Sequence, residues 1–216
     1  MTSRHYIYRA AGLALLGAVG VLSIGCGEVA RTGRAPAMLI IERLEAASGA
    51  APDEMGSFLQ SDVQTLVSET INGQIVRVPT IFNDVGSVTF RLALKNPGSA
   101  GAPLTPTTLN EITVSRYRVV YRRSDGRGVQ GVDVPYSFDG AFTVTISANG
   151  TAIAGFDLVR HQAKQEPPLR NLIGNGSAQF ISTIAEVTFF GRDQAGNEVI
   201  AVGTIGVNFA DFGDPD

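Results

Sequence analysis

The sequence predicts an all-β protein, folded as an antiparallel β-sandwich of about seven to nine strands after an N-terminal signal peptide. Short segments rich in Val, Ile and Thr alternate apolar and polar residues with the period of a strand. Turn-forming pairs such as Asn-Gly separate many of these segments, and no helical period runs between them. Closely spaced strands joined by hairpins are typical of an antiparallel sandwich.

Residues 1–25 have the composition of an export signal. Arg4 and Arg9 precede a short apolar run that extends from residue 10 to Cys26, the only cysteine of the chain. This run is shorter than the ~20 apolar residues of a transmembrane helix, and a basic segment before such a run is typical of a secretory signal peptide. We therefore predict that these residues form a signal peptide.

The sequence Leu22-Ser23-Ile24-Gly25-Cys26, at the end of the apolar run, resembles the lipobox of bacterial lipoproteins. Ser23 occupies the position at which that family prefers Leu, and Leu22 lies one place earlier. The resemblance implies that Cys26 is lipidated: its thiol becomes a thioether to diacylglycerol, and cleavage leaves Cys26 as the first residue of the mature chain.

The lipoprotein resemblance also implies a location. The protein is expected in the bacterial cell envelope, attached to a membrane by palmitate-type chains on Cys26 and facing the periplasm or the cell surface. Gly27 stands where a retention signal for the inner membrane has Asp, so the outer membrane is the expected destination. Two alternatives remain open: an ordinary signal peptide cut after a small residue, and an uncleaved membrane anchor.

Composition limits the classes of function. The signal contains two of the 17 Lys and Arg residues and none of the 20 Asp and Glu residues, which leaves the mature chain with a net charge of −5. An acidic chain does not favour nucleic-acid binding, which uses a basic surface. Because Cys26 is the only cysteine, no disulfide can form within the mature chain, and packing must stabilise the domain.

The segment before the first strand, residues 26–37, is expected to be a flexible tether because it is small, polar and contains proline. Residues 38–48 fit either a helix or a strand. The apolar cluster at 38–41 favours a strand over 38–47. One face of that strand would hold Met38, Ile40, Glu42, Leu44 and Ala46.

A long insertion around 48–86 separates this strand from the next one. A short strand is expected within 58–69, and Asn72-Gly73 predicts a hairpin turn. The insertion would then add edge strands to the sandwich.

Residues 87–95 and 111–123 show the clearest alternation of apolar and polar side chains. The expected inward-facing residues are Val88, Phe90, Leu92 and Leu94 in the first strand, and Tyr117, Val119 and Tyr121 in the second. The arginines between these tyrosines are interpreted as the wet face of a sheet rather than as an anion-binding site. Val120 interrupts the polar face, which indicates a bulge.

Four further strands are expected to form two hairpins. These strands are predicted at 141–147, 151–161, 182–190 and 198–209. The first hairpin turns at Ala148–Gly150 and the second at 191–197. Between the hairpins, residues 161–179 form a polar connector, in which Pro167-Pro168 excludes a continuous helix. An acidic tail, 211–216, ends the chain.

The last hairpin carries a second resemblance. Its turn, residues 193–197 (DQAGN), has the D-x-x-G-N pattern of the final hairpin in bacterial Ig-like domains. Segment 87–123 is also similar to part of the water-stress sandwich domain. The Ig-like resemblance implies that residues 38–216 form an Ig-like β-sandwich, with the long insertion around 48–86 and an acidic C-terminal tail.

Ig-like connectivity would place the connections in two groups. Loop 96–110 and the turns of both late hairpins share the end at which the tether enters. The opposite end gathers 48–86, 124–140 and 162–181, and long loops on a rigid scaffold often carry binding sites. These loops could equally be solvated connectors. The candidate binding residues on them are Arg127, Asp133, Tyr136, Asp139, His161, Lys164, Glu166 and Arg170.

The mature chain offers few residues for catalysis. His161 is its only histidine, which excludes a zinc site with several His ligands, and no G-x-S-x-G motif accompanies it. A hydrolase would have to use paired carboxylates chosen from Asp133, Asp139 and Glu166.

Calcium binding would need clustered oxygen ligands. The only clusters are Asp193 with Asn197, and Asp211 with Asp214 and Asp216 in the tail. Such side chains more often cap their own turns, so no metal or cofactor is expected.

The preferred hypothesis is a non-enzymatic envelope lipoprotein. It would bind or assemble with an envelope protein or a polysaccharide through the β-sandwich domain, with no nucleic acid as a partner. The alternatives are an envelope hydrolase that uses loop carboxylates, and a calcium-linked structural module.

Overall fold

The fold is described by a computed structural model, in which residues 33–212 are placed. The predicted signal peptide, the lipobox with Cys26 and the tail residues 213–216 lie outside the described residues. The expectation of a β-rich fold is confirmed: strands make up most of the described chain, and α3 (His161–Lys164) is one short helical turn. Among residues 33–212, no helix is long and apolar enough to cross a bilayer.

The twelve strands of the described chain range from two to 13 residues in length. They are β1 (Ala37–Ala47), β2 (Phe58–Asp62), β3 (Thr65–Ile71), β4 (Gln74–Thr80), β5 (Asp84–Leu94), β6 (Gly98–Ser99), β7 (Ala102–Pro103), β8 (Ile112–Arg123), β9 (Phe138–Ile146), β10 (Thr151–Val159), β11 (Ile181–Asp193) and β12 (Glu198–Ala210). Short 3-10 turns are η1 (Thr108–Asn110), η2 (Leu169–Leu172) and η3 (Gly176–Ala178).

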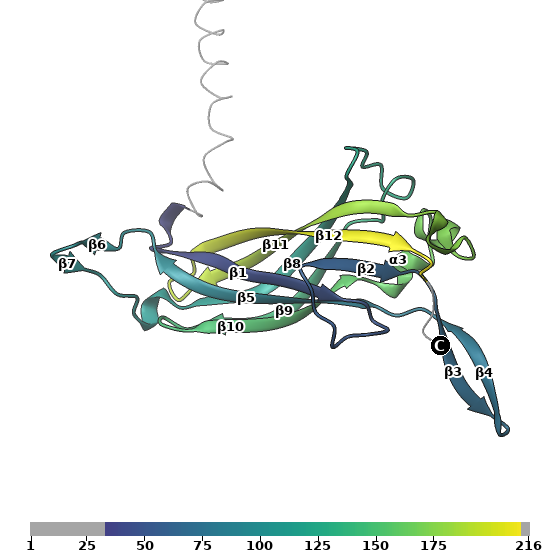
Figure 1. Ribbon diagram of the computed structural model, residues 1–216. Helices are drawn as coiled ribbons and strands as arrows, with labels where there is room; N and C mark the ends of the chain where they lie inside the picture. Colours follow the sequence, from purple (N-terminus) through teal and green to yellow (C-terminus); the bar gives the residue numbers. More distant parts are fainter. Residues whose placement is uncertain (1–32, 213–216) are drawn as a thin grey trace, which may run out of the picture.

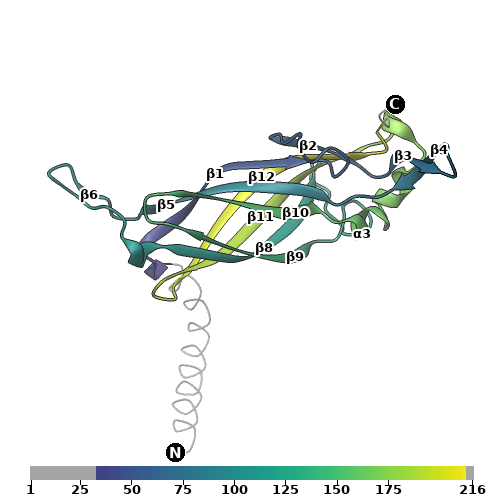
Figure 2. The same ribbon diagram turned by 90° about the horizontal axis from the view of Figure 1, so that it is seen from below.

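Eight of these strands form two larger sheets (Figure 1). One sheet has the order β1-β5-β10 and the other has the order β2-β12-β11-β8-β9. All neighbouring strands in the two sheets are antiparallel, except that β2 runs parallel to β12. Since β1 contacts β12 and β10 contacts β9, the sheets approach each other along both sides and enclose one core (Figures 1 and 2).

Aromatic rings connect the two sheets through this core. The ring of Phe189 on β11 lies 5.0 Å from that of Phe90 on β5 and 5.5 Å from that of Phe156 on β10, both edge to face. The predicted alternation of β5 and β8 is confirmed, because the inward-facing residues named above are buried, except Leu94, which is partly buried against the core. The tyrosines of β8 thus face the core, and Arg116, Arg118 and Arg122 face outward.

The first strand shows one correction to the predicted faces. The strand interpretation of this segment is confirmed and the helix is wrong. However, Leu39 is buried and Met38 is exposed, the reverse of the expected pattern. The register of β1 against β5 shifts between Ile41 and Arg43, and a bulge of one residue moves every side chain before it to the other face.

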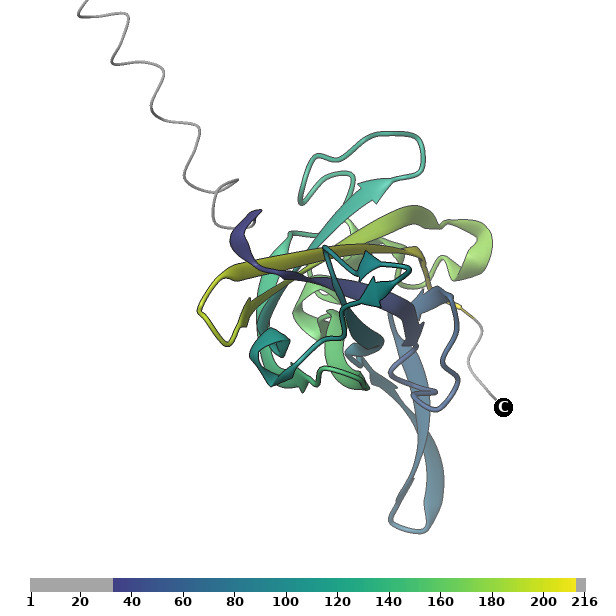
Figure 3. The ribbon, with the colours of Figure 1, turned by 90° about the vertical axis from the view of Figure 1, so that its left-hand side faces the viewer.

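The insertion between β1 and β5 contributes to the fold in two ways. Strand β2 extends the five-stranded sheet as an edge strand beside β12. Strands β3 and β4 form a separate two-stranded hairpin that projects from the body (Figures 1 and 3). The hairpin predicted from Asn72-Gly73 is confirmed, since both residues have positive φ, 53° and 79°.

The connector between β10 and β11 is more deeply embedded than its polar sequence predicts. It contains α3, η2 and η3, and Leu169 and Leu172 of η2 are buried in the core. The two prolines separate α3 from η2, as expected. The segment expected to be tether also contributes one residue to the core, because Ala35 is buried while Arg34 and Pro36 are exposed.

The connections gather at two ends of the body. The proximal end, defined as the end at which β1 begins, holds loop 96–110 and the β11–β12 turn (Figures 1 and 2). The distal end holds the loop between β8 and β9, α3, the β3–β4 hairpin and the end of β12 (Figure 1). This division is the one that the strand order in the sequence predicts.

Candidate functional site

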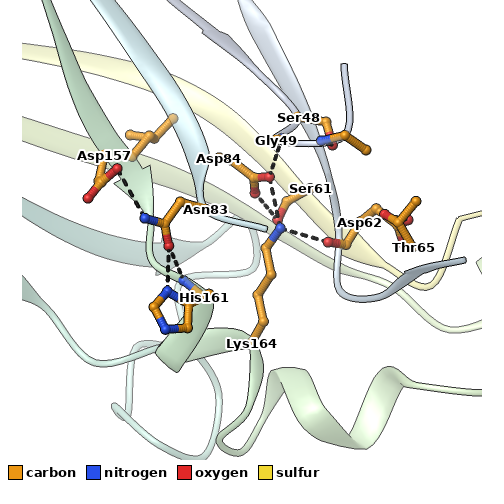
Figure 4. Close-up of polar contacts among 12 residues, drawn as sticks. Ser48, Gly49, Ser61, Asp62, Thr65, Asn83, Asp84, Asp157, His161 and Lys164 are labelled. Atoms are coloured by element: carbon orange, nitrogen blue, oxygen red, sulfur yellow. Dashed lines mark hydrogen bonds and ion pairs between the residues drawn. The ribbon is translucent and has the colours of Figure 1, made fainter. Parts of the chain in front are cut away.

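A buried ion pair lies at the distal end of the molecule (Figure 4). The Nζ atom of Lys164 lies 2.8 Å from Oδ1 of Asp84, and the two side chains are 1% and 0% exposed. Lys164 is the last residue of α3 and Asp84 is the first residue of β5. The pair therefore joins segments that lie 80 residues apart in the chain.

Three further groups complete what we call the Lys164–Asp84 cluster. The Ser61 hydroxyl donates a hydrogen bond to Oδ2 of Asp84 (2.6 Å), and the Gly49 amide donates to Oδ1 (3.0 Å). The Lys164 ammonium also donates to the carbonyl oxygen of Asp62 (2.7 Å). The cluster thus links the loop after β1, strand β2, the start of β5 and α3 (Figure 4).

Strand alternation explains why a carboxylate points into the interior at this place. Val88 and Phe90 of β5 face the core, and Asp84 has the same parity along the strand. The lysine reaches it because Asp84 pairs with Val159, the last residue of β10, and α3 begins two residues later.

The electrostatics of the cluster favour a structural role. Burial raises the pKa of the Asp84 carboxyl, while the Lys164 ammonium and the hydrogen bonds from Lys164, Ser61 and Gly49 oppose that rise. Both carboxylate oxygens accept hydrogen bonds from within the protein. The cluster therefore offers no free base or nucleophile and is suited to hold its four segments together.

A second polar group anchors the start of α3. The Oδ1 atom of Asn83 accepts a hydrogen bond from the His161 amide (2.7 Å) and lies 2.8 Å from its Nδ1 atom (Figure 4). The Nδ2 atom of Asn83 donates to Oδ1 of Asp157 (3.4 Å). Because the Nδ1 atom of His161 faces the amide oxygen of Asn83, the imidazole tautomer that fits has its proton on Nδ1. These contacts hold His161 in place as the first residue of α3, two residues after the end of β10.

Asp62 connects the same region to the end of the described chain. Its carboxylate accepts hydrogen bonds from the Thr65 hydroxyl (2.7 Å) and from the Phe212 amide (3.1 Å). Burial raises the pKa of the Asp62 carboxyl, whereas the hydrogen bonds from Thr65, Phe212 and Gln64 lower it.

The loop between β8 and β9 brings two candidate residues together. The Arg127 guanidinium lies 2.7 Å from the Asp125 carboxylate and 3.7 Å from that of Asp133. Hydrogen bonds from Arg127 lower the pKa of Asp125 to about 2. Tyr136 is exposed in the same loop, and its hydroxyl lies against Gly131, whose φ of 77° suits glycine.

The other candidate binding residues do not join this group. Asp139 faces Arg116 on β8 at 3.6 Å, on the outer side of the sheet. Glu166 and Arg170 are exposed and are joined through a backbone hydrogen bond. The prediction that Lys164 is a surface contact is wrong. Its side chain is buried, and its ammonium pairs with the interior carboxylate of Asp84.

Four of the carboxylates considered for hydrolysis or calcium have nearby partners: Asp133, Asp139, Asp193 and Asp211. Asp193 accepts hydrogen bonds from the Ala195 amide and from the amide and side chain of Asn197, so it caps its own turn. Asp211 accepts one from the Gly174 amide, and the tail carboxylates beyond it lie outside the described residues. Within residues 33–212, no group of three or more His, Cys, Asp or Glu residues could hold a metal ion.

Sequence reasoning missed the partners of Lys164. A signal for Asp84 was present, because it extends the inward-facing series of β5 by two steps. No comparable signal marked Ser61, whose burial depends on the parallel pairing of β2 with β12. The need for glycine at position 49 is seen only in the folded protein. A Cβ atom added there would lie 2.0 Å from the carbonyl oxygen of Asn83.

Comparisons with known proteins add no further assignment to this geometry. The chain matches no protein-family model, no curated protein and no solved structure.

Proposed function

We propose that the protein is a non-enzymatic envelope lipoprotein, anchored through Cys26. Its Ig-like β-sandwich binds an envelope protein or a polysaccharide with the distal end, in the outer membrane and facing the periplasm or the cell surface. The observation that carries the binding role is a set of exposed apolar side chains on three distal segments.

Those side chains lie on separate parts of the distal end. Ile75 lies on the β3–β4 hairpin, Val132 in the β8–β9 loop and Phe180 just before β11, and all three are exposed. Large apolar side chains exposed on neighbouring projections of one end offer contacts for a partner that spans that end. The polar groups nearby are engaged with each other, which supports binding rather than catalysis.

The strand order supports the Ig-like part of the proposal. The seven strands that the sequence predicts correspond to β1, β5, β8, β9, β10, β11 and β12. In a constant-type Ig domain, the first, second, fourth and fifth strands form one sheet and the other three form the second sheet. The order here differs at one strand, since β9 pairs with β8 instead of joining β10 and β5.

Lipid anchoring is tested with the full chain in a bacterial host that is fed an alkyne analogue of palmitate. Wild type is expected to incorporate the analogue into the membrane fraction, and Cys26→Ser is expected to lose it. Ser23→Leu restores the residue that the lipobox family prefers and serves as the control that keeps the label. Label that persists in Cys26→Ser would contradict anchoring at this residue.

Distal binding is tested with a photo-cross-linking amino acid placed at Val132 or, as a matched control, at Val202 on the outer face of the five-stranded sheet. Both valines are exposed, at 69% and 55%. A discrete adduct in intact cells is expected from position 132 and not from position 202. Equal adducts from both positions, or none from position 132, would argue against a distal binding surface.

A further inference from the structure

An uncharged arm projects from the proximal end of the molecule (Figures 1 and 2). It consists of residues 96–110, between β5 and β8, and includes β6, β7 and η1. Its flanking residues in the sequence are Lys95 and Glu111, and no charged residue lies between them. The arm is thus a protrusion of small, apolar and neutral polar residues.

Hydrogen bonds give the arm a defined conformation. The Leu104 amide donates to the Pro97 carbonyl (2.9 Å), and the Gly98 amide donates to the Asn96 side chain (3.0 Å). Gly98 has a φ of 80°, a conformation that suits glycine. The Leu104 side chain lies against Gly98: a Cβ atom added to the glycine would be 3.2 Å from Cγ of Leu104. The arm therefore holds Leu104 at a specific position.

The second leucine of the arm is held by a capped turn. Leu109 lies in η1, where the Thr107 amide donates to the Asn110 side chain (2.9 Å). Leu104 and Leu109 are nevertheless 56% and 73% exposed. A structured arm therefore presents two leucines to the surroundings, with no charge nearby within its own sequence.

The position of the arm indicates what covers these leucines. Strand β1 begins at the same end of the body as the arm (Figures 1 and 2). Only residues 27–34 separate Cys26 from Ala35, which is buried in the core. Such a segment spans at most about 30 Å when fully extended. A lipid on Cys26 would thus hold the proximal end within reach of the bilayer.

We propose that the arm 96–110 rests on the membrane surface, with Leu104 and Leu109 inserted at the level of the lipid headgroups and upper acyl chains. The inference rests on the proposed lipid anchor, because that anchor supplies the nearby bilayer. An uncharged segment pays no free energy to desolvate charged groups when it enters that layer. Burial of its exposed leucines there is favourable because it removes apolar area from water. The contact directs the distal end away from the membrane.

The experiment uses the full chain, extracted from membranes and reconstituted into vesicles of phosphatidylethanolamine and phosphatidylglycerol. An environment-sensitive fluorophore is attached to Leu104→Cys or, as a matched control, to Ile75→Cys on the distal β3–β4 hairpin. Both positions are exposed aliphatic residues of a projecting hairpin. Wild type, whose only cysteine is Cys26, is treated in parallel.

The expected result is a blue-shifted emission at position 104 that spin-labelled lipid chains quench and iodide does not. Position 75 should show the reverse. Equal quenching of both positions by spin-labelled lipid, or quenching of position 104 by iodide, would overturn the inference. Labelling of wild type would show a free Cys26 thiol, so failure of the anchor is detected separately from failure of the arm.

Discussion

A lysine with 1% of its side chain exposed depends on its neighbours for every hydrogen bond it makes. Lys164 donates to Asp84 and to the carbonyl of Asp62, and the carboxylate in turn accepts from Ser61. Moving these charges from water into the interior costs free energy, which their mutual attraction offsets. Removal of one partner therefore destabilises the folded state by more than the intact pair stabilises it.

Lys164→Met is expected to destabilise the protein by about 3–5 kcal/mol, because it leaves the Asp84 carboxylate buried without a counter-charge. Chemical unfolding followed by circular dichroism measures this, since the chain has no tryptophan. The double variant Lys164→Met/Asp84→Asn removes both charges and is expected to recover part of the loss. A double variant no more stable than the single one would contradict the argument.

Asp62→Asn tests the pKa shift at the neighbouring carboxyl. Since burial raises the pKa of Asp62, the folded state holds the proton more tightly than the unfolded state does. The stabilisation from that proton is complete below the unfolded pKa, about 4, and is lost as pH rises through the folded value.

Asp62→Asn cannot ionise at this side chain, so its stability relative to wild type is expected to rise between about pH 4 and about pH 7. Urea unfolding at the two pH values measures the difference. Asp53→Asn, at an exposed position, controls for the loss of one surface carboxylate. A relative loss of stability for Asp62→Asn over this interval would refute the sign of the shift.

At the scale of elements, short-range sequence signals performed well where a strand is regular and its turn is tight. The alternation of β5 and the Asn72-Gly73 turn are both confirmed. The faces of β1 were wrong before Glu42, because a bulge depends on the partner strand and leaves no mark in the alternation. Leu169 was missed because only Leu169, Leu172 and Ile173 in the polar connector have the spacing of a helical face, and three residues are too few to predict a buried turn.

The β3–β4 hairpin is expected to be dispensable for folding. Its strands pair with each other and with no other strand of the described chain, and their ends meet where Thr65 pairs with Thr80. Replacing residues 66–79 by a short Gly-Ser linker should leave the thermal midpoint within a few degrees of wild type, because the two sheets stay intact.

Circular dichroism melting tests this deletion. The matched control is Leu59→Ala in β2, which lies in the same insertion but is buried at the edge of the five-stranded sheet. It should cost about 2–5 kcal/mol. A deletion that abolishes cooperative unfolding while Leu59→Ala is tolerated would contradict this division of the insertion.

At the scale of the whole molecule, stability comes from the core shared by the two sheets. Phe189 is its centre, since its ring contacts rings from both sheets: Phe90 and Phe156 across the core, and Phe142 on β9 at 6.2 Å. Phe189→Ala should cost about 3–5 kcal/mol in chemical unfolding, because it removes the ring that joins the sheets.

The adjacent residue provides the control for this prediction. Phe190 has the same chemistry but lies on the outer face, where the guanidinium of Arg116 stacks 4.0 Å from its ring centre. Phe190→Ala should cost about 1 kcal/mol, mainly the lost cation–π contact. Equal costs for the two substitutions would show that the sheets do not depend on the aromatic core.

Local sequence patterns were sufficient to predict the β-rich class, the inward residues of β5 and β8, the hairpin turns and the two groups of loops. These follow from backbone periodicity and local turn conformation, which neighbouring residues control. Three features became evident only in the folded molecule: β2 runs beside β12, β9 joins β8, and Lys164 is buried against Asp84. Each of these depends on contacts between distant segments, whose free energy no local pattern reports.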